Sequence, residues 1–374
     1  GTPQDIEWAW VKDQTFILQS RPITALPAPP ARVFGGQSRG PIEYFQIRPY
    51  PLDATTWTPA VSRAISRMVP LGKSVPSLDE LWQEEDGVVA SFNGMPSLRP
   101  STDLVLLPFR LIALAIQHDP RRWREDPVLQ IALTRIHDLG ATDLGARSWA
   151  GLLDMTDAAL DVPMEIVELR RRYLPRTLLA MLGLRLVLKL LDRPDDFGRL
   201  LSGIDNKTLE ANRELESLAA SIRATPELAA VVASHDAASL ATALESVPEG
   251  QAFRQAMQTF LAHYGHRELA SPLLVSQPTW ADAPEAVLGL LRTMSQTDTS
   301  PIHDTGAWQT ARDEILGLPD LQFPPLRRAF LHLLDGARQF PPLREDTHFY
   351  LTTPIPVLRR IFAEMGQRLV AAGV

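Results

Sequence analysis

The spacing of apolar residues changes once along the chain, near Leu104. Before this point, short apolar runs alternate with proline-rich stretches. After it, apolar residues recur every three or four positions, which is the period of amphipathic helices. The pattern predicts a mainly α fold with a small β component near the N-terminus. We expect three parts: a hairpin over residues 1–26, a linker and mixed extended region over 27–103, and a helical domain over 104–374.

The first part contains two aromatic-rich runs around a short polar turn, which is the pattern of a β-hairpin. Glu7 and Gln19 fall on opposite runs, so strand pairing would bring them together. Arg21 lies two residues beyond Gln19 and therefore on the same face. A carboxylate binds Mg²⁺ and a guanidinium binds phosphate oxygens, so the three residues could hold a metal-bound polyphosphate. The alternative is an ordinary surface hairpin.

The second part begins with a proline-rich linker, residues 26–30. Tyr44 to Trp57 contains two prolines and several aromatic residues, which predicts extended structure or loop rather than a central strand. Val88 to Phe92, followed by Asn-Gly, predicts one short strand and a turn.

The helical part contains segments of different character. Leu104 to Gln117 is almost wholly apolar and is expected to be buried. Trp149 to Leu160 predicts a short amphipathic helix. Val162 to Leu191 is long and contains Pro175, so a kink or a break is expected there.

Composition narrows the class of protein. The 374 residues are 45% hydrophobic and 22% charged, with a net charge of −7, which is typical of a globular protein and argues against a nucleic-acid binder. The absence of cysteine excludes disulfides, thiolate metal sites and cysteine nucleophiles. The most apolar run, Thr177 to Leu191, is too short to span a bilayer and carries Arg185 and Lys189. We expect a cytoplasmic protein with no membrane or nucleic-acid partner.

A first polar cluster surrounds a glycine that is expected to end a helix, at Gly265. His263, His266 and Glu268 have no clear further ligand, so no metal is expected. One interpretation is histidines that meet the negative end of the helix dipole. The other is a polar cluster at a pocket, in which His266 and Arg267 are candidate substrate-binding residues.

A second cluster is Arg344, Glu345 and His348, which would share one face of a helix. Arginine would stabilise the charge of a transferred phosphoryl group, and the glutamate or histidine would take a hydroxyl proton. A surface ion-pair cluster is equally compatible with the composition. The triplet at residues 170–172, three arginines, invites a phosphate-binding interpretation, but a solvated helix face is favoured.

The amino-acid sequence of the predicted hairpin resembles that of a known hairpin. The matching stretches are Pro-Gln-Asp-Ile-Glu-Trp-Ala and Leu-Gln-Ser-Arg-Pro-Ile-Thr. The predicted hairpin is similar to the closing hairpin of the ATP-grasp domain in the pyruvate phosphate dikinase and phosphoenolpyruvate synthase superfamily. The resemblance implies that Glu7, Gln19 and Arg21 line a Mg-ATP site. It also implies that the chain begins at the tail of an ATP-binding domain, so ATP and Mg would serve the full-length enzyme without binding tightly to this chain.

Later motifs resemble the middle domain of the rifampicin phosphotransferase family. They are Tyr-Gly-His-Arg at residues 264–267, Arg-Glu at 344–345 followed by Phe-Tyr at 349–350, Arg-Arg at 359–360, and Gly-Gln-Arg-Leu at 366–369. The family's Arg-Glu-x-x-Lys motif is thought to face an incoming phosphohistidine. Here His348 replaces the lysine, which makes this position titratable near neutrality.

This resemblance implies a helical acceptor-binding domain placed between an ATP-grasp domain and a swivelling domain that carries a phosphorylated histidine. The expected partners are a small-molecule acceptor and those two domains, in the same polypeptide or complex. The family's phosphohistidine loop does not occur in the sequence. We therefore expect a fragment of a dikinase-type phosphotransferase that is inactive alone.

Two alternatives remain. The chain could be the middle domain of a biosynthetic ATP-dependent synthetase of the prodigiosin-condensing type, or a non-catalytic helical interaction module. A deep apolar pocket rimmed by the two polar clusters would favour an enzyme, and exposed clusters over a filled core would favour the interaction module.

Overall fold

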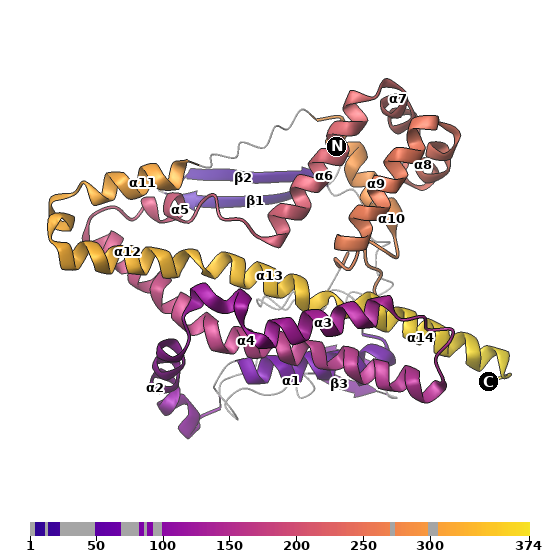
Figure 1. Ribbon diagram of the computed structural model, residues 1–374, viewed down its shortest axis with the longest axis horizontal. Coiled ribbons are helices and arrows are strands. Elements are labelled where there is room, and N and C mark those ends of the chain that lie inside the picture. Colours follow the sequence, from indigo (N-terminus) through magenta and orange to yellow (C-terminus); the bar gives the residue numbers. More distant parts are fainter. Residues whose placement is uncertain are drawn as a thin grey trace. The chain divides into compact units, whose positions relative to one another are not determined.

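The computed structural model describes residues 4–11, 14–22, 49–68, 82–85, 88–92, 99–269, 274–297 and 306–374. The described chain is mainly helical, as the spacing of apolar residues predicted (Figure 1). Strands β1 (Gln4–Val11) and β2 (Gln14–Pro22) pair antiparallel, with Glu7 opposite Gln19 and a register shift after Glu7. Strands β3 (Trp82–Glu85) and β4 (Val88–Phe92) form a second antiparallel pair.

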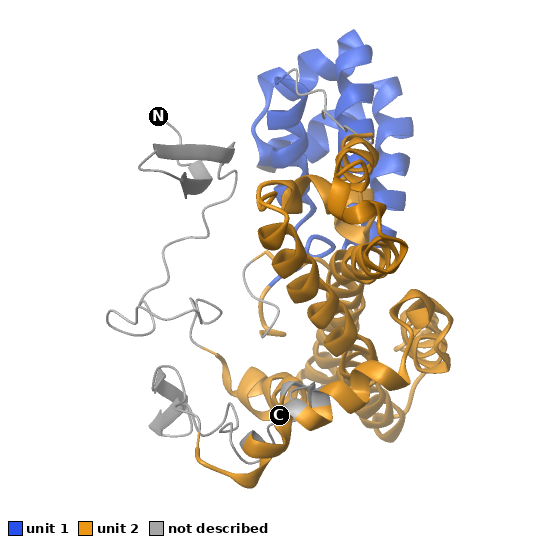
Figure 2. Ribbon diagram, turned by 90° about the vertical axis from the view of Figure 1, so that its left-hand side faces the viewer, with its two compact units in different colours: residues 1–33, 211–265, 278–301 blue, residues 34–210, 266–277, 302–374 orange. Residues whose placement is uncertain are grey.

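The chain divides into two compact units (Figure 2). Unit 1 contains residues 1–33, 211–265 and 278–301, and unit 2 contains residues 34–210, 266–277 and 302–374. The helices of unit 1 are most of α6 (Lys207–Ala224), α7 (Pro226–Ser234), α8 (Ala237–Ala243), the short turn η5 (Leu244–Ser246), α9 (Pro248–Tyr264) and α10 (Pro284–Ser295).

Unit 1 is held by an aromatic core at the end of α9. The Phe260 and Trp280 rings stack with centroids 5.9 Å apart, and Phe260 also meets Tyr264 at 5.1 Å. Tyr264 is buried, and its hydroxyl donates to Glu214 of α6 at 3.0 Å. The pairing satisfies the one polar atom that a buried tyrosine brings into the core.

Unit 2 contains a π-helical turn and the remaining helices. They are η1 (Asp53–Trp57), α1 (Thr58–Met68), α2 (Thr102–Gln117), η4 (Pro120–Glu125), α3 (Pro127–Ala141), α4 (Trp149–Leu190), α5 (Asp196–Leu200), α11 (Ala307–Leu316), η6 (Pro319–Gln322), α12 (Pro324–Arg338), α13 (Phe340–Thr352) and α14 (Pro354–Ala371). Helices α1, α2, α3, α12, α13 and α14 all pack against α4. Its buried side chains join two apolar clusters, one toward each end of the helix.

Helix α4 corrects the predicted division of this segment. It is a single helix of 42 residues that runs through Pro163 and Pro175, so of the kink or break expected at Pro175 the break does not occur. A proline inside a helix removes one hydrogen bond and costs about 3 kcal/mol. Both prolines are buried, and burial of α4 by neighbours on several sides offsets that cost.

The start of unit 2 corrects a second expectation. Residues 51–68 are helical, whereas the segment up to Trp57 was predicted to be extended or loop. Buried Asp53 accepts the Tyr50 backbone N–H at 2.9 Å. It also accepts the backbone N–H and the hydroxyl of Ser276, at 2.8 and 2.6 Å. A partner 223 positions away fixes this segment, so local sequence could not reveal it.

Helix α2 was expected to be buried, and this is wrong. Val105, Phe109 and Ile116 are 72%, 70% and 75% exposed. Helix α2 packs against α4, and one neighbour covers only one side of a helix. An apolar run therefore does not show how many neighbours a helix has. Among the described helices, none has the length and apolarity to cross a bilayer.

The contact between α4 and α12 depends on glycine. A Cβ atom at Gly336 would lie 2.9 Å from the Cβ of Ala180. We predict that Gly336→Ala lowers the free energy of unfolding by about 1–3 kcal/mol, because the two helices must separate. Gly366→Ala in α14 is the control, since its Cβ would meet nothing within 4 Å. It should stabilise the protein by about 0.5–1 kcal/mol. Urea denaturation measures both, and equal effects would contradict the prediction.

Candidate functional site

The second polar cluster lies on α13, as predicted. Prolines at 341 and 342 open this helix, where the missing N–H groups cost nothing. Leu343, Asp346 and Thr347 are buried, Arg344 is exposed, and Glu345 and His348 are half-buried. One side of α13 is therefore anchored in unit 2, and the other presents the predicted residues.

Arg344 and Glu345 contact one another. Their Nη1 and Oε1 atoms are 3.5 Å apart. The second carboxylate oxygen of Glu345 accepts the hydroxyl of Thr208, from the start of α6, at 3.2 Å. Glu345 is thus held from two sides while Arg344 extends toward solvent.

His348 has a different partner. Its Nε2 atom lies 3.2 Å from Oε1 of Glu268, in the segment after α9. Burial alone would raise the pKa of Glu268, but the hydrogen bond and charge of His348 hold that pKa below its usual value. The structure therefore joins one residue of the second cluster to one of the first.

His266 lies beneath this contact. It is only 7% exposed, and its ring meets Phe349 edge-on with centroids 4.2 Å apart. Burial lowers the pKa of His266 to about 4, and the charge of Arg267 acts in the same direction. Its Nε2 atom is buried and has no hydrogen-bond partner among the described residues. A neutral imidazole packed in this way supports the loop that carries Glu268.

Arg170 belongs to the arginine triplet for which the sequence favoured a solvated helix face. Its Nε donates to Thr347 Oγ1 at 2.7 Å and its Nη2 to the Arg344 carbonyl at 3.1 Å. Burial and the nearby Arg344 lower the pKa of Arg170 to about 10. The half-buried guanidinium of Arg170 thus makes two hydrogen bonds to α13, which hold the backbone of the cluster in place.

The arginine triplet is therefore not the solvated face that was expected. Arg171 and Arg172 pair with Glu168 at 2.7 and 2.9 Å, and Arg172 also reaches Asp126 at 3.1 Å. Arg171 therefore pairs within α4, Arg172 links α4 to the start of α3, and Arg170 links α4 to α13.

Asp346 is a further residue that sequence reasoning missed. Its carboxylate accepts from the Arg124 guanidinium and from the Lys207 backbone N–H, both at 2.8 Å. Burial raises its pKa. The N–H groups at a helix start favour a negative partner, so Asp346 ties the start of α6 to α13.

For the hairpin residues, the structure describes only which backbone positions of the two strands lie opposite each other. Glu7 lies opposite Gln19, and Arg21 lies opposite Asp5. Their side chains lie outside the described residues. Among the residues that the structure does describe, no group of three or more His, Asp or Glu side chains is arranged to hold a metal ion.

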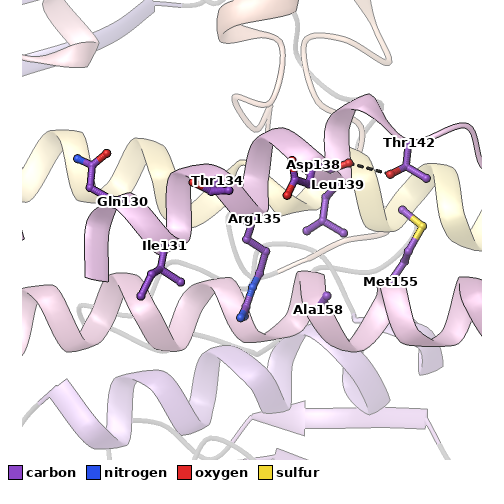
Figure 3. Close-up of a pocket in the computed structure, with 9 residues that line it drawn as sticks. All are labelled: Gln130, Ile131, Thr134, Arg135, Asp138, Leu139, Thr142, Met155 and Ala158. Atoms are coloured by element: carbon purple, nitrogen blue, oxygen red, sulfur yellow. Dashed lines mark hydrogen bonds between the residues drawn. The ribbon is translucent and has the colours of Figure 1, made fainter. Parts of the chain in front are cut away.

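The largest described cavity, about 560 Å³, lies along α3 and α4 (Figure 3). Figure 3 shows Ile131 and Arg135 directed from α3 toward α4, and Met155 directed from α4 toward α3. Ala158 lines the cavity twelve positions before Arg170, about 18 Å along the helix axis. None of the predicted site residues lines it. The cavity is therefore separate from the cluster on α13.

Comparison with known proteins gives three matches. Residues 172–345 match the family model of the rifampicin phosphotransferase fourth domain. The chain is 30% identical to chondramide synthase cmdD of Chondromyces crocatus over 184 residues. This alignment covers 48% of the chain and 5% of the synthase. Over 181 residues, also 48% of the chain, it is 25% identical to the uncharacterized phosphotransferase YvkC of Bacillus subtilis (strain 168), which covers 22% of that protein. The matched region is thus a small part of each relative.

The predicted resemblance is confirmed over residues 172–345, which are similar to the rifampicin phosphotransferase fourth domain. The match to a phosphotransferase of Bacillus subtilis agrees with this similarity. The matched region includes Arg344 and Glu345 and ends before His348.

Burial of His266 predicts a pH-dependent stability. Its pKa is about 4 in the folded protein against 6.5 ordinarily, so the unfolded chain binds a proton below pH 6.5 that the folded chain does not. The free energy of unfolding should fall as the pH is lowered from 6.5 to 4, by up to about 1.4 kcal/mol per pH unit.

Urea unfolding at several pH values tests this, with His266→Gln and the exposed His263→Gln as a matched pair. His266→Gln should flatten the dependence over this window, and His263→Gln should leave it unchanged. The same slope in all three proteins would show that other groups cause it.

Proposed function

We propose that this chain supplies the acceptor-binding portion of an ATP-dependent phosphotransferase that works through a phosphohistidine relay. The match of residues 172–345 to the rifampicin phosphotransferase fourth domain supports this proposal. The acceptor is a small molecule, and the partners are an ATP-grasp domain and a swivelling phosphohistidine domain of the same polypeptide or complex. The complete enzyme works in the cytoplasm.

The observation that carries the proposal is the cluster on α13. Arg344 is an exposed residue whose backbone carbonyl is held by half-buried Arg170. Glu345 and His348 are half-buried on the same helix. A cation on a held backbone near two proton acceptors suits phosphoryl transfer, in which positioning and charge stabilisation supply most of the catalysis. The phosphohistidine approaches Arg344, and the acceptor lies on the side of Arg267 and His266.

In this arrangement, buried His266 supports the site and does not bind the acceptor itself. Since its Nε2 atom is enclosed, it shapes the acceptor side through the loop of residues 266–268. Arg267 precedes Glu268 directly, and in this proposal it is the residue of the pair that contacts the acceptor.

Mg-ATP is assigned to the hairpin. The opposite positions of Glu7 and Gln19 in the register, with Arg21 two residues on, support one wall of a nucleotide site. Glu7 would hold Mg²⁺, and Arg21 would bind phosphate oxygens.

A second candidate function has a specific observation behind it. The similarity to a chondramide synthase favours a domain of a biosynthetic synthetase, in which phosphorylation activates an acid for condensation. The absence of the α13 residues from the described cavities instead favours an interaction module. Phosphorylation of an acceptor by the full-length protein separates these from the leading proposal.

For the transfer cluster, we predict that Arg344→Ala in the full-length protein slows phosphoryl transfer about a hundredfold, the effect of losing one stabilising group at a transition state. Phosphorylation of the enzyme by ATP should remain. Radiolabelled ATP measures both steps, with rifampicin as the first acceptor probe. Arg328→Ala, an exposed arginine of α12, is the control. Unchanged turnover in both Arg344→Ala and His348→Ala would reduce the cluster to a surface ion pair.

For the nucleotide, we predict that this chain binds Mg-ATP more weakly than about micromolar. Three side chains of one hairpin offer few of the contacts that enclose a triphosphate. Isothermal titration calorimetry with Mg-ATP measures this, and Arg21→Ala controls for nonspecific heat. Micromolar affinity that Arg21→Ala abolishes would show that the hairpin suffices as a site.

A further inference from the structure

The contact between Glu268 and His348 determines which imidazole nitrogen is available for chemistry. A carboxylate can only accept a hydrogen bond, so the Nε2 atom 3.2 Å from Glu268 carries the proton. The neutral ring then has its lone pair on Nδ1. Within the described part of the chain, Nδ1 has no hydrogen-bond partner. The lowered pKa of Glu268 keeps its carboxylate ionised near neutrality.

Glu268 is held firmly enough to orient the ring. Its side chain is 23% exposed, against 43% for His348. Two residues earlier, buried His266 packs edge-on against Phe349, which follows His348 on α13. This aromatic contact joins the loop of residues 266–268 to α13 next to the Glu268–His348 pair. The carboxylate therefore lies on the inner side and the imidazole on the outer side, where a ligand reaches it.

We propose that Glu268 is a positioning residue that fixes the tautomer of His348 and leaves Nδ1 as the base for the acceptor hydroxyl. The inference rests on the proposed function and adds a residue that the Arg344 cluster did not contain. Carboxylate, imidazole and hydroxyl would be arranged as in other enzymes that hold a histidine base with a buried acid.

The step balances as follows. The acceptor O–H proton moves to Nδ1 of His348 while the new O–P bond forms and the P–N bond of the phosphohistidine breaks. The freed donor imidazole takes up one proton, and His348 releases one. The imidazolium formed in between is stabilised by the Glu268 carboxylate, while Arg267 and Arg344 supply positive charge for the phosphoryl group.

The tautomer can be measured on this chain without any substrate. Nitrogen-15 NMR of labelled histidine, assigned with His348→Gln, should show only the Nε2–H form of His348 at pH 8.5. Glu268→Gln should produce a mixture, because an amide can both accept and donate. Glu249→Gln, an exposed glutamate on α9, should leave the tautomer as it is. A Nδ1–H form, or the same mixture in all proteins, would overturn the proposal.

The role in transfer requires the full-length enzyme. The probe is phosphoryl transfer to rifampicin, or to water where rifampicin is not phosphorylated. His348→Ala should slow transfer about a hundredfold, the usual contribution of a general base, and added imidazole should restore part of the rate. Glu268→Gln should slow transfer about tenfold or more with the acceptor KM unchanged, and Glu268→Asp should keep more activity if the glutamine variant folds poorly.

The double variant separates positioning from an independent effect. If Glu268 acts only through His348, Glu268→Gln in the His348→Ala background should cost nothing further. Additive losses, or no rescue by imidazole, would overturn the proposal while Arg344→Ala still slows transfer. If Arg344→Ala is also without effect, the proposed function itself fails.

Discussion

Helix α4 passes through Pro163 and Pro175 without ending, and α1, α2, α3, α12, α13 and α14 all pack against it. An isolated helix with two internal prolines would be costly, so α4 owes its continuity to its neighbours. Among the described helices of unit 2, these six all contact α4. The small residues Gly336 and Ala180, in contact distance across α4 and α12, show how closely the backbones approach. The position of α13, and with it the candidate site, follows from this packing.

One side of helix α13 anchors it in unit 2, and the opposite side presents accessible polar residues. Thr347 and Asp346 face inward and are held by Arg170, Arg124 and the start of α6. These contacts are charge-assisted and partly buried, so they define one backbone position rather than several. On the other side, Arg344 and His348 remain accessible. The proposed phosphoryl transfer would benefit from this combination, because groups on a held backbone need less rearrangement when charge develops.

The comparisons show a similarity to the rifampicin phosphotransferase fourth domain that includes part of the α13 cluster. The family match covers residues 172–345 and therefore includes Arg344 and Glu345 but stops before His348. The two relatives, a chondramide synthase and a phosphotransferase, are matched over 5% and 22% of their lengths. The family motif has lysine where this chain has His348, and a lysine could not form the dyad proposed with Glu268. The position at which the chain departs from the motif of the similar family is thus the position where its chemistry is proposed to differ.

The sequence by itself determined the helical character after Leu104, the resemblance to rifampicin phosphotransferase and the common helix of Arg344 and His348, because periodicity and motif spacing are local properties. It did not determine the continuity of α4, the helix at Asp53 or the exposure of Phe109. Each depends on partners far along the chain: Ser276 for Asp53, and the number of neighbours for α2 and α4. The same holds for the site. Arg170 under Arg344, and Glu268 beside His348, are separated from their partners by 174 and 80 positions, and only the tertiary structure brings such residues within hydrogen-bonding distance.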